Sequence, residues 1–402
     1  MFKLFCIASF EFVLNGAVHK RFRPYYDFYR IEASADLVTW DPFTFLQRTN
    51  ALSNIISFRD SGLERHQFYR VMTNHLISPF PRPNGPFAAG VFSRLLTDQS
   101  RSNRYGIYTN SSFMISVWYP AMDRPDVSLQ PCLHLRPQDD VGLANFRDRV
   151  PYLVTHAVQD APGLTNQAPF PIVLFSPGWS ALRSGFAEKG PILASHGYVA
   201  VAVDHADATL TDFPDGRVLY GEQIISDAGF EGRVTDLKFI LEQLTQWNNS
   251  DPILAGRLDL SRVAAIGHSW GGGVSAELSR IDARVKAVVL FDAYMQNAWE
   301  VSQHGLAKPF LGMYTTEGGG IDIPYALPET KTAIWFIISP SLHAQLEDHY
   351  WSNFSSDLAG GREIARTLND FTLWFLNKYL RNQDEPMPPR SNYPRITAFK
   401  QK

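Results

Sequence analysis

Beyond residue 110, short and nearly continuous apolar runs alternate with segments that have helical spacing. The clearest runs cover residues 199–203 and 287–291, where no polar residue interrupts the apolar stretch. Strands that are covered by helices on both faces of a sheet have this pattern. The segment 362–380 instead repeats apolar residues at intervals of three and four, as a helix that packs on a sheet requires.

Strand and helix signals then follow one another along the chain. Strands are predicted at 113–119, 172–176, 199–204, 263–267, 285–292 and 333–338, and helices at 184–195, 230–247, 272–281 and 362–380. This alternation predicts an α/β fold with a mostly parallel central sheet flanked by helices.

The first 75 residues have a different pattern. Short alternating runs at 10–14, 28–33, 57–59 and 67–72 are separated by turn residues, which predicts a small all-β, sandwich-like module over 10–75. The Pro-rich stretch 76–86 is typical of a stiff linker. We therefore expect an uncertain leader over 1–9, the β module, the linker, and one large α/β domain over 87–402.

Composition narrows the classes of partner. The 37 Lys and Arg residues nearly balance the 40 Asp and Glu residues, and no long basic run is present, so a nucleic-acid partner is not expected. The apolar stretch 4–10 is too short to span a bilayer, and no transmembrane segment is expected. The appended module favours a secreted or periplasmic location. Whether Cys6 and Cys132 pair, and the oligomeric state, stay open.

A Gly-x-Ser-x-Gly pattern, with Ser269 at its centre, lies between the predicted strand ending near 267 and a Gly-rich helix. A serine on such a sharp strand-to-helix turn projects its hydroxyl clear of the sheet. The alternative is an ordinary Gly-rich helix entry. The strand, the turn and the downstream partners favour Ser269 as a nucleophile.

A nucleophilic serine needs a base and a carboxylate that orients the base. In this class of fold the carboxylate and then the histidine follow the serine along the chain. Asp292 ends the apolar run 285–291 and is the favoured acid, with Glu317 and Asp322 in reserve.

Three histidines follow Ser269. His343 comes after the strand 333–338 and a short loop, which suits a base that reaches back to the serine, and it is the favoured base. His349 is the fallback, in a helix expected to begin near 344. His304 has no preceding strand in the predicted pattern.

The oxyanion of a tetrahedral intermediate needs two preorganised donors. We predict the backbone N–H of Trp270, which follows the nucleophile, and that of Trp179, in the loop after the strand 172–176.

Several of these motifs occur together and in a fixed order. The segments are 175–179 (Phe-Ser-Pro-Gly-Trp), 193–199, 204–205, 267–272, 292–295 and His343, and the approach 85–90 with 117–121 precedes them. Over about residues 80–380 the set resembles the plasma-type platelet-activating factor acetylhydrolases and their bacterial relatives. The resemblance implies an α/β-hydrolase fold, the triad Ser269, Asp292 and His343, and oxyanion amides from Trp179 and Trp270.

Aromatic residues make up 13% of the chain, and some fall in or beside the predicted catalytic loops. Trp179, Trp270, Tyr294, Trp299 and Trp351 are predicted to line an apolar substrate pocket. The cluster around Asp204 and His205 matches no standard metal-ligand spacing, so no metal is expected there. Phosphate-loop and dinucleotide motifs are missing from the sequence, and no cofactor is implied.

The sequence therefore predicts a serine carboxylic ester hydrolase that works through an acyl-enzyme on short-acyl or lipid-like esters. A polyester, cutinase-like hydrolase that uses the same triad is the first alternative. A binding or scaffold protein with an inert serine turn is the second.

Overall fold

A computed structural model describes most of the chain after residue 80 and six short strands before it. The described residues are 11–14, 17–22, 28–34, 41–47, 56–60, 68–72, 81–101, 111–123, 129–131, 154–179, 181–205, 211–213, 218–219, 225–315, 332–338 and 358–402. The predictions made for Glu317, Asp322, His343, His349 and Trp351 lie outside these residues.

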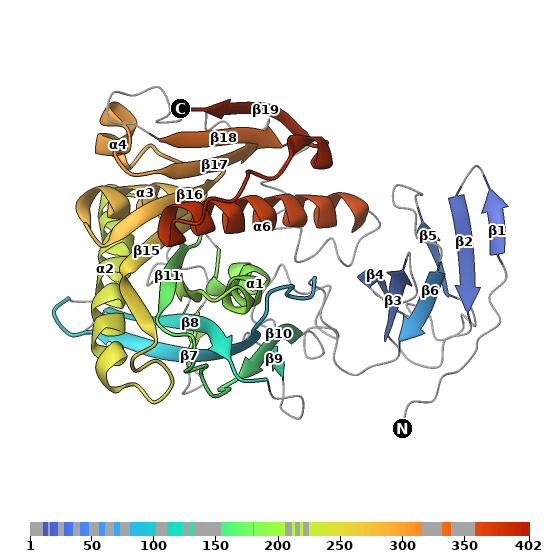
Figure 1. The fold of residues 1–402 in the computed structure, drawn as a ribbon, viewed down its shortest axis with the longest axis horizontal. Helices are drawn as coiled ribbons and strands as arrows, with labels where there is room; N and C mark the ends of the chain where they lie inside the picture. The colour runs from blue at the N-terminus through green and yellow to red at the C-terminus, as the bar shows by residue number, and fades with distance from the viewer. Residues whose placement is uncertain are drawn as a thin grey trace.

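Six neighbouring strands in the middle of an eleven-stranded sheet run parallel (Figure 1). In spatial order they are β12 (Val199–Asp204), β11 (Phe170–Ser176), β15 (Leu258–His268), β16 (Val285–Phe291), β17 (Phe310–Thr315) and β18 (Ala333–Ile338). Every residue of β11 and β12 is buried, as their apolar sequences predict. The mostly parallel α/β architecture is confirmed, and the carboxyl ends of these strands lie along one edge of the sheet.

Strands of mixed direction complete the sheet on both sides. β19 (Ile396–Gln401) pairs antiparallel with β18 at one end. At the other end follow β8 (Ser111–Ala121), β7 (Ala88–Asp98), β10 (Val154–Gln159) and β9 (Leu129–Pro131). A separate pair consists of β13 (Thr211–Asp212) and β14 (Val218–Leu219).

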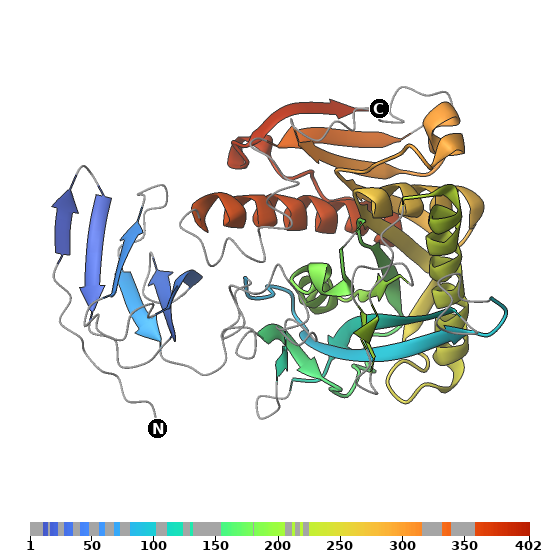
Figure 2. The same cartoon turned by 180° about the vertical axis from the view of Figure 1, so that it is seen from behind.

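Helices cover both faces of the parallel strands (Figures 1 and 2). One apolar core joins the sheet to α1 (Lys189–Ser195) and α6 (Leu358–Arg381), and a second joins it to α2 (Asp227–Ser250) and α3 (Trp270–Ile281). Along β11, Val173 and Phe175 belong to the first core, while Ile172 and Leu174 belong to the second. This alternation follows from the two-residue repeat of a strand. The short α4 (Trp299–His304) follows β16.

The helix predicted over 184–195 is divided in two. The structure has a 3-10 turn, η4 (Arg183–Phe186), and then α1. Pro191 explains the break, because proline fits the first turn of a helix but clashes with the preceding turn in a helix interior. The helices predicted at 230–247, 272–281 and 362–380 are present and are longer than predicted, and the helix expected to begin near 344 lies outside the described residues. Ser226 caps α2, since its hydroxyl accepts a hydrogen bond of 3.1 Å from Gly229 N.

Six strands precede residue 81: β1 (Glu11–Leu14), β2 (Ala17–Phe22), β3 (Phe28–Ser34), β4 (Asp41–Gln47), β5 (Ile56–Asp60) and β6 (Phe68–Met72). They pair as two antiparallel three-stranded sheets, in the orders β1-β2-β5 and β4-β3-β6. That this segment is a separate module, with boundaries at 75 and 86, stays a prediction.

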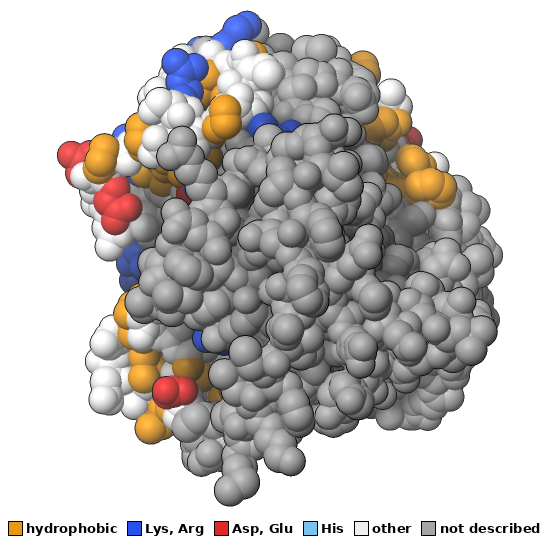
Figure 3. All heavy atoms as spheres, turned by 90° about the vertical axis from the view of Figure 1, so that its right-hand side faces the viewer, with side chains coloured by type: hydrophobic (Ala, Val, Ile, Leu, Met, Phe, Trp, Pro, Cys, Tyr) orange, Lys and Arg blue, Asp and Glu red, His pale blue; other side chains and the backbone are white. Residues whose placement is uncertain are grey.

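Charged and apolar side chains are mixed on the described surface. Figure 3 shows one face, at whose margin hydrophobic, basic and acidic side chains lie beside one another. Within the described residues, no helix combines the length and the apolar character needed to cross a bilayer.

Candidate active site

Ser269 occupies the sharp turn between the end of β15 and the start of α3. Its backbone angles are φ 51° and ψ −122°, a conformation that a non-glycine residue adopts only under strain. Two hydrogen bonds hold this conformation: Ser269 N donates to Phe291 O at 2.9 Å, and Tyr294 N donates to Ser269 O at 2.8 Å. The strain therefore sits at the residue that the Gly-x-Ser-x-Gly pattern singles out.

The two glycines of this pattern are required by close backbone contacts. A Cβ at Gly267 would lie 2.0 Å from Gly271 O, and a Cβ at Gly271 would lie 2.1 Å from Ser176 O. Any side chain at these positions would displace backbone rather than a flexible group. The steric requirement predicted for the turn is thus present in the structure.

Asp292 emerges beside Ser269 at the carboxyl edge of the sheet. The register of β15 with β16 pairs His268 with Phe291. Ser269 directly follows His268, and Asp292 directly follows Phe291. Asp292 is buried, with φ 45°, and its N–H donates to Met313 O at 2.8 Å. The structure therefore brings the predicted nucleophile and the predicted acid to adjacent strand ends.

Tyr314, on the neighbouring β17, is also buried near Asp292. Burial, and then the negative charge of Asp292, raise the pKa of the Tyr314 phenol. Among the described residues its hydroxyl has no hydrogen-bond partner. The phenol therefore stays protonated near the carboxylate.

The predicted base, His343, can be related to the sheet only through β18, the strand that precedes it. His343 itself lies outside the described residues, five residues after the end of β18. Since β18 runs parallel to β17, it ends at the same edge as β15 and β16. His304, in contrast, is exposed on α4, with its Nε2 3.7 Å from Glu300 Oε2.

The loop after β11 lies directly against the nucleophile. A Cβ at Gly178 would lie 3.2 Å from Ser269 Cβ and 3.2 Å from His268 Nδ1. The next residue, Trp179, is 41% exposed. This loop is the one predicted to carry an oxyanion donor, and it reaches the serine.

Arg233, a residue that the sequence pattern does not single out, links this loop to the start of α3. It is only 1% exposed, and its Nη1 donates to Pro177 O at 3.0 Å and to Gly178 O at 3.1 Å. Its guanidinium carbon lies 4.4 Å from the Trp270 ring centroid. The only sequence signal is a charged residue on the apolar face of α2, between Phe230 and Val234.

A buried polar chain fixes the strand end just before the loop. Ser176 Oγ and His205 Nε2 share a hydrogen bond of 3.0 Å, and His205 Nδ1 lies 2.9 Å from Asp236 Oδ2. Arg101 Nη2 then donates to Asp236 Oδ1 at 2.7 Å, and Arg101 Nε donates to Asp98 Oδ2 at 2.5 Å. The chain joins the end of β11, the residue after β12, α2, the end of β7 and the turn that follows β7.

A buried ion pair fixes the other side of the loop. The Arg183 guanidinium pairs with Asp204, and Arg183 N donates to Asp204 Oδ1 at 2.5 Å. Arg183 Nε donates to Ser116 Oγ at 3.1 Å. Asp204 and His205, considered above as metal ligands, thus bind other side chains. Within the described residues, no group of three His, Cys, Asp or Glu side chains is placed to hold a metal ion.

The predicted pocket aromatics differ in exposure. Trp299 is 65% exposed, Trp179 is partly exposed, and Tyr294 is half-buried with its hydroxyl bonded to Gln296. The Trp270 side chain is 1% exposed, and its Nε1 donates to Asn297 Oδ1 at 3.0 Å. Of the four described aromatics, Trp270 therefore has the least side-chain surface available to a ligand.

Two known families match this chain. Platelet-activating factor acetylhydrolase, isoform II, matches residues 77–213, and the PET hydrolase-like family matches residues 162–306. Together the two matches include Ser176, Gly178, Ser269 and Asp292.

Individual relatives agree with these families. Platelet-activating factor acetylhydrolase of Cavia porcellus is 25% identical over 292 residues, which are 63% of this chain and 62% of the relative. Bis(hydroxyethyl) terephthalate hydrolase of Streptomyces coelicolor is 30% identical over 128 residues, or 32% of this chain and 34% of the relative. The chain thus matches less than two thirds of the length of these relatives.

A solved structure supports the fold. Ferulic acid esterase from Streptomyces cinnamoneus superposes with a TM-score of 0.61 at 23% identity, covering 78% of this chain and 97% of the esterase. The chain therefore has an α/β-hydrolase-like fold and is similar, over two overlapping segments, to the platelet-activating factor acetylhydrolase isoform II and PET hydrolase-like families of carboxylic ester hydrolases.

Proposed function

We propose that the protein hydrolyses carboxylic esters through an acyl-enzyme formed on Ser269. The observation that carries the proposal is the strained backbone of Ser269, with Gly178 so close beside it that a Cβ there would lie 3.2 Å from the Ser269 Cβ. Strain of this kind persists only where the surroundings enforce it, and it concentrates at functional sites. Asp292 at the adjacent strand end supports the same reading.

In the proposed reaction, His343 takes the proton of the Ser269 hydroxyl as the oxygen attacks the ester carbonyl. Asp292 stabilises the resulting imidazolium. The imidazolium then gives its proton to the alkoxide leaving group as the acyl-enzyme forms. Water, deprotonated by His343, attacks the acyl carbonyl, and the proton returns to Ser269 as the carboxylic acid leaves.

The negative charge on the tetrahedral intermediate is held by the backbone N–H groups of Trp179 and Trp270 in this proposal. The first belongs to the loop that touches Ser269, and the second begins α3. The N-terminus of α3 adds a favourable partial positive charge near the oxyanion. One such donor contributes about 10²–10³ in rate in serine hydrolases.

The substrate class that we favour is a short-acyl or lipid-like ester. The match to platelet-activating factor acetylhydrolase isoform II supports it, since that match covers β7, β8 and the loop after β11. We place the acyl or alcohol part against Trp179, Tyr294, Trp299 and Trp351.

A polyester is the second candidate, and the exposure of two tryptophans favours it. Trp179 and Trp299 are 41% and 65% exposed and belong to segments that follow the ends of β11 and β16. Exposed aromatic side chains suit contact with a flat apolar polymer better than they suit the lining of a closed pocket. The match to the PET hydrolase-like family points the same way.

A fluorophosphonate probe and an ester panel test the proposal. We expect rapid labelling of wild-type protein at Ser269 and none in Ser269→Ala, with Ser250→Ala, an exposed serine on α2, labelled as wild type. The panel compares a p-nitrophenyl ester series, an acetyl-ester phospholipid and a polyester film. Unchanged ester cleavage in Ser269→Ala would overturn the catalytic proposal and leave a binding or scaffold role.

A further inference from the structure

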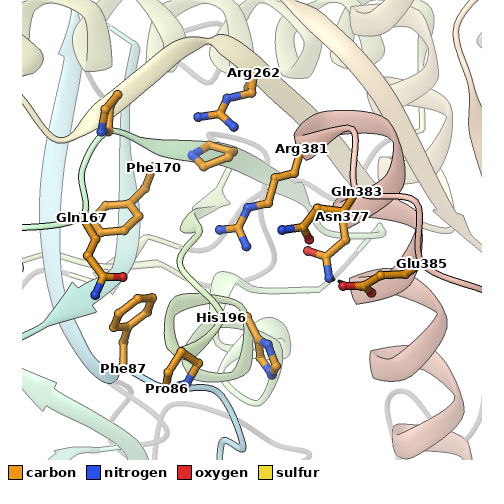
Figure 4. Close-up of a pocket in the computed structure, with 12 residues that line it drawn as sticks. Pro86, Phe87, Gln167, Phe170, His196, Arg262, Asn377, Arg381, Gln383 and Glu385 are labelled. Carbon is orange, nitrogen blue, oxygen red and sulfur yellow. Dashed lines mark hydrogen bonds between the residues drawn. The ribbon is translucent and has the colours of Figure 1, made fainter.

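A cavity lies at the edge of the sheet opposite Ser269 (Figure 4). Its volume is about 470 Å³, and its lining includes Phe170 and Pro171 at the start of β11, whereas Ser176 ends that strand. A seven-residue strand is roughly 20 Å long. The cavity is therefore separate from the proposed catalytic site, and its function does not depend on ester hydrolysis.

One wall of the cavity is aromatic. The rings of Phe87 and Phe170 meet edge to face, with their centroids 6.1 Å apart at an interplanar angle of 64°. Pro86, Pro169 and Pro171 extend this apolar wall. Phe170 and Pro171 are buried, so a flat apolar group in the cavity would pack mainly on the half-buried Phe87, which Phe170 supports from behind, and on Pro86 and Pro169.

Gly197 keeps the space between the walls open. Its φ is 82°, and a Cβ there would lie 2.8 Å from Arg381 Nη2 and 3.2 Å from Phe87 Cε2. A side chain at this position would project between the aromatic wall and the arginine. Glycine serves both the backbone conformation and the shape of the cavity.

The facing wall carries two guanidinium groups from different elements. Arg381, on α6, donates from Nη2 to Gly197 O at 2.5 Å and lies with its Cζ 4.1 Å from the Tyr198 ring centroid. Arg262, on β15, donates from Nε to Asp259 Oδ2 at 2.5 Å. Figure 4 shows both guanidinium groups pointing into the cavity.

Neither guanidinium has all its donors in use. Within the described part of the chain, the two terminal nitrogens of Arg262 make no hydrogen bond, and Nη2 is the only nitrogen of Arg381 that makes one. A guanidinium presents five N–H donors in a planar fork that matches a carboxylate. Donors therefore remain for a bound anion.

Arg262, Arg381 and Glu385 are the charged residues of the lining. Burial, and the positive charge of Arg262, lower the pKa of Arg381. Glu385 is the one carboxylate among the lining side chains, and Asp259 beside Arg262 and Asp370 near His196 lie outside the lining.

His196 adds no charge at neutral pH. Burial, and then Arg381, lower the pKa of its imidazole, which shares a 2.8 Å hydrogen bond with Asn84 Oδ1. The lining thus has two positive groups and one negative group.

We propose that this cavity binds an organic carboxylate, with the carboxylate on Arg262 and Arg381 and a flat apolar group against Phe87. The two walls match the two halves of such a molecule. The volume is within the range of sites for small ligands, about 300–1,000 Å³. An inorganic anion would satisfy only the cationic wall.

Calorimetric titration with benzoate tests the assignment, with benzyl alcohol as the uncharged counterpart and inorganic phosphate as the anion without a ring. We expect benzoate to bind wild-type protein with Kd of about 0.1–1 mM, a range typical of a molecule of nine heavy atoms. Phosphate and benzyl alcohol should bind at least about tenfold more weakly. Raising the salt concentration should weaken benzoate binding.

Arg262→Gln is the informative variant because its side chain is partly exposed and the change leaves α6 intact. We expect about a tenfold rise in the Kd for benzoate in Arg262→Gln with an unchanged melting temperature. Arg284→Gln, which removes a surface arginine paired with Asp282, should bind as wild type. Equal affinity in Arg262→Gln and wild type, or equal affinity for benzoate and benzyl alcohol, would overturn the proposal. Ser269→Ala should bind benzoate unchanged, and loss of binding in it would assign the ligand to the catalytic site instead.

Discussion

The guanidinium carbon of Arg233 lies 4.4 Å from the ring centroid of Trp270, while Nη1 of the same group donates to the carbonyl oxygens of Pro177 and Gly178. A single buried side chain thus contacts the start of α3 and the loop after β11. The two proposed oxyanion amides, from Trp179 and Trp270, belong to these two segments. Arg233 therefore holds these two segments relative to each other.

Arg233→Lys tests this positioning role. Lysine keeps the charge, but it is a point charge without the planar fork, so it cannot reproduce two hydrogen bonds together with stacking on an indole. We expect kcat for a p-nitrophenyl ester to fall about 10–100-fold with KM within about twofold, since the loss falls on the transition state. The measurement is steady-state kinetics on enzyme whose active sites are counted by phosphonate titration.

Arg284→Lys is the matched control, because Arg284 is a partly exposed arginine whose partner is Asp282. It should leave kcat unchanged. If Arg233→Lys lowers the melting temperature while kcat per titrated site stays at the wild-type value, Arg233 has a structural role only.

The sheet and the nucleophile could be predicted because their signals are local. The run 333–338 and the Gly-x-Ser-x-Gly turn are each readable from a few consecutive residues, and β18 begins and ends at the predicted residues. Asp292 was predicted from the end of one apolar run, and the register of β15 with β16 puts it beside Ser269. In a parallel sheet, the ends of strands far apart in sequence meet at one edge.

The supporting contacts could not be predicted, because they depend on long-range packing. Arg233 and Asp236 lie on a helix whose apolar spacing predicts only a buried face. Their partners, Pro177 O for Arg233 and His205 for Asp236, come from segments more than 30 residues away. The prediction of one continuous helix over 184–195 was wrong because it missed a local signal: Pro191 marks the first turn of a helix rather than a helix interior.

Asp236 joins Arg101 and His205, and we expect its removal to weaken both contacts. Asp236 Oδ1 accepts from Arg101 and Oδ2 lies 2.9 Å from His205 Nδ1; Asp236 and His205 are buried, and the Arg101 side chain is 23% exposed. Asp236→Asn should lower the free energy of unfolding by about 3–5 kcal/mol, as loss of one partner from a buried ion pair does. Denaturant unfolding measures this.

A double-mutant cycle that combines Asp236→Asn with Arg101→Gln measures the interaction energy between Asp236 and Arg101 apart from their other contacts. We expect the double variant to be less destabilised than the sum of the single variants by about 0.5–3 kcal/mol. Simple additivity would mean that Asp236 acts through His205 alone.

Through Asp98, the stability of the polar chain that runs from Ser176 to Asp98 depends on pH. Burial tends to raise the pKa of Asp98, but the hydrogen bonds from Ser100 and Arg101 outweigh it, and the net pKa is lowered. The unfolded chain therefore binds a proton at a higher pH than the folded protein does. The stabilisation is complete above the ordinary aspartate pKa of about 3.9 and is lost as the pH falls through the lower folded value.

Asp98→Asn should consequently be less stable than wild type by about 1–2 kcal/mol at pH 7, and the difference should shrink toward pH 3. Melting temperatures measured from pH 3 to pH 7 test this. Asp123→Asn, at an exposed position, is the control and should follow wild type throughout. A stability difference that stays constant across this range would contradict the linkage.

Tyr314→Phe should stabilise the protein or leave its stability unchanged. The Tyr314 hydroxyl is buried and has no hydrogen-bond partner among the described residues, so folding removes it from water without compensation. Phenylalanine keeps the ring volume and removes that cost, which is about 1–3 kcal/mol for a neutral polar group. We expect a melting temperature equal to or above that of wild type, with kcat unchanged, because the phenol stays protonated and neither gives nor takes a proton in the proposed reaction. A fall in kcat together with a fall in stability would show instead that the hydroxyl supports Asp292 during catalysis.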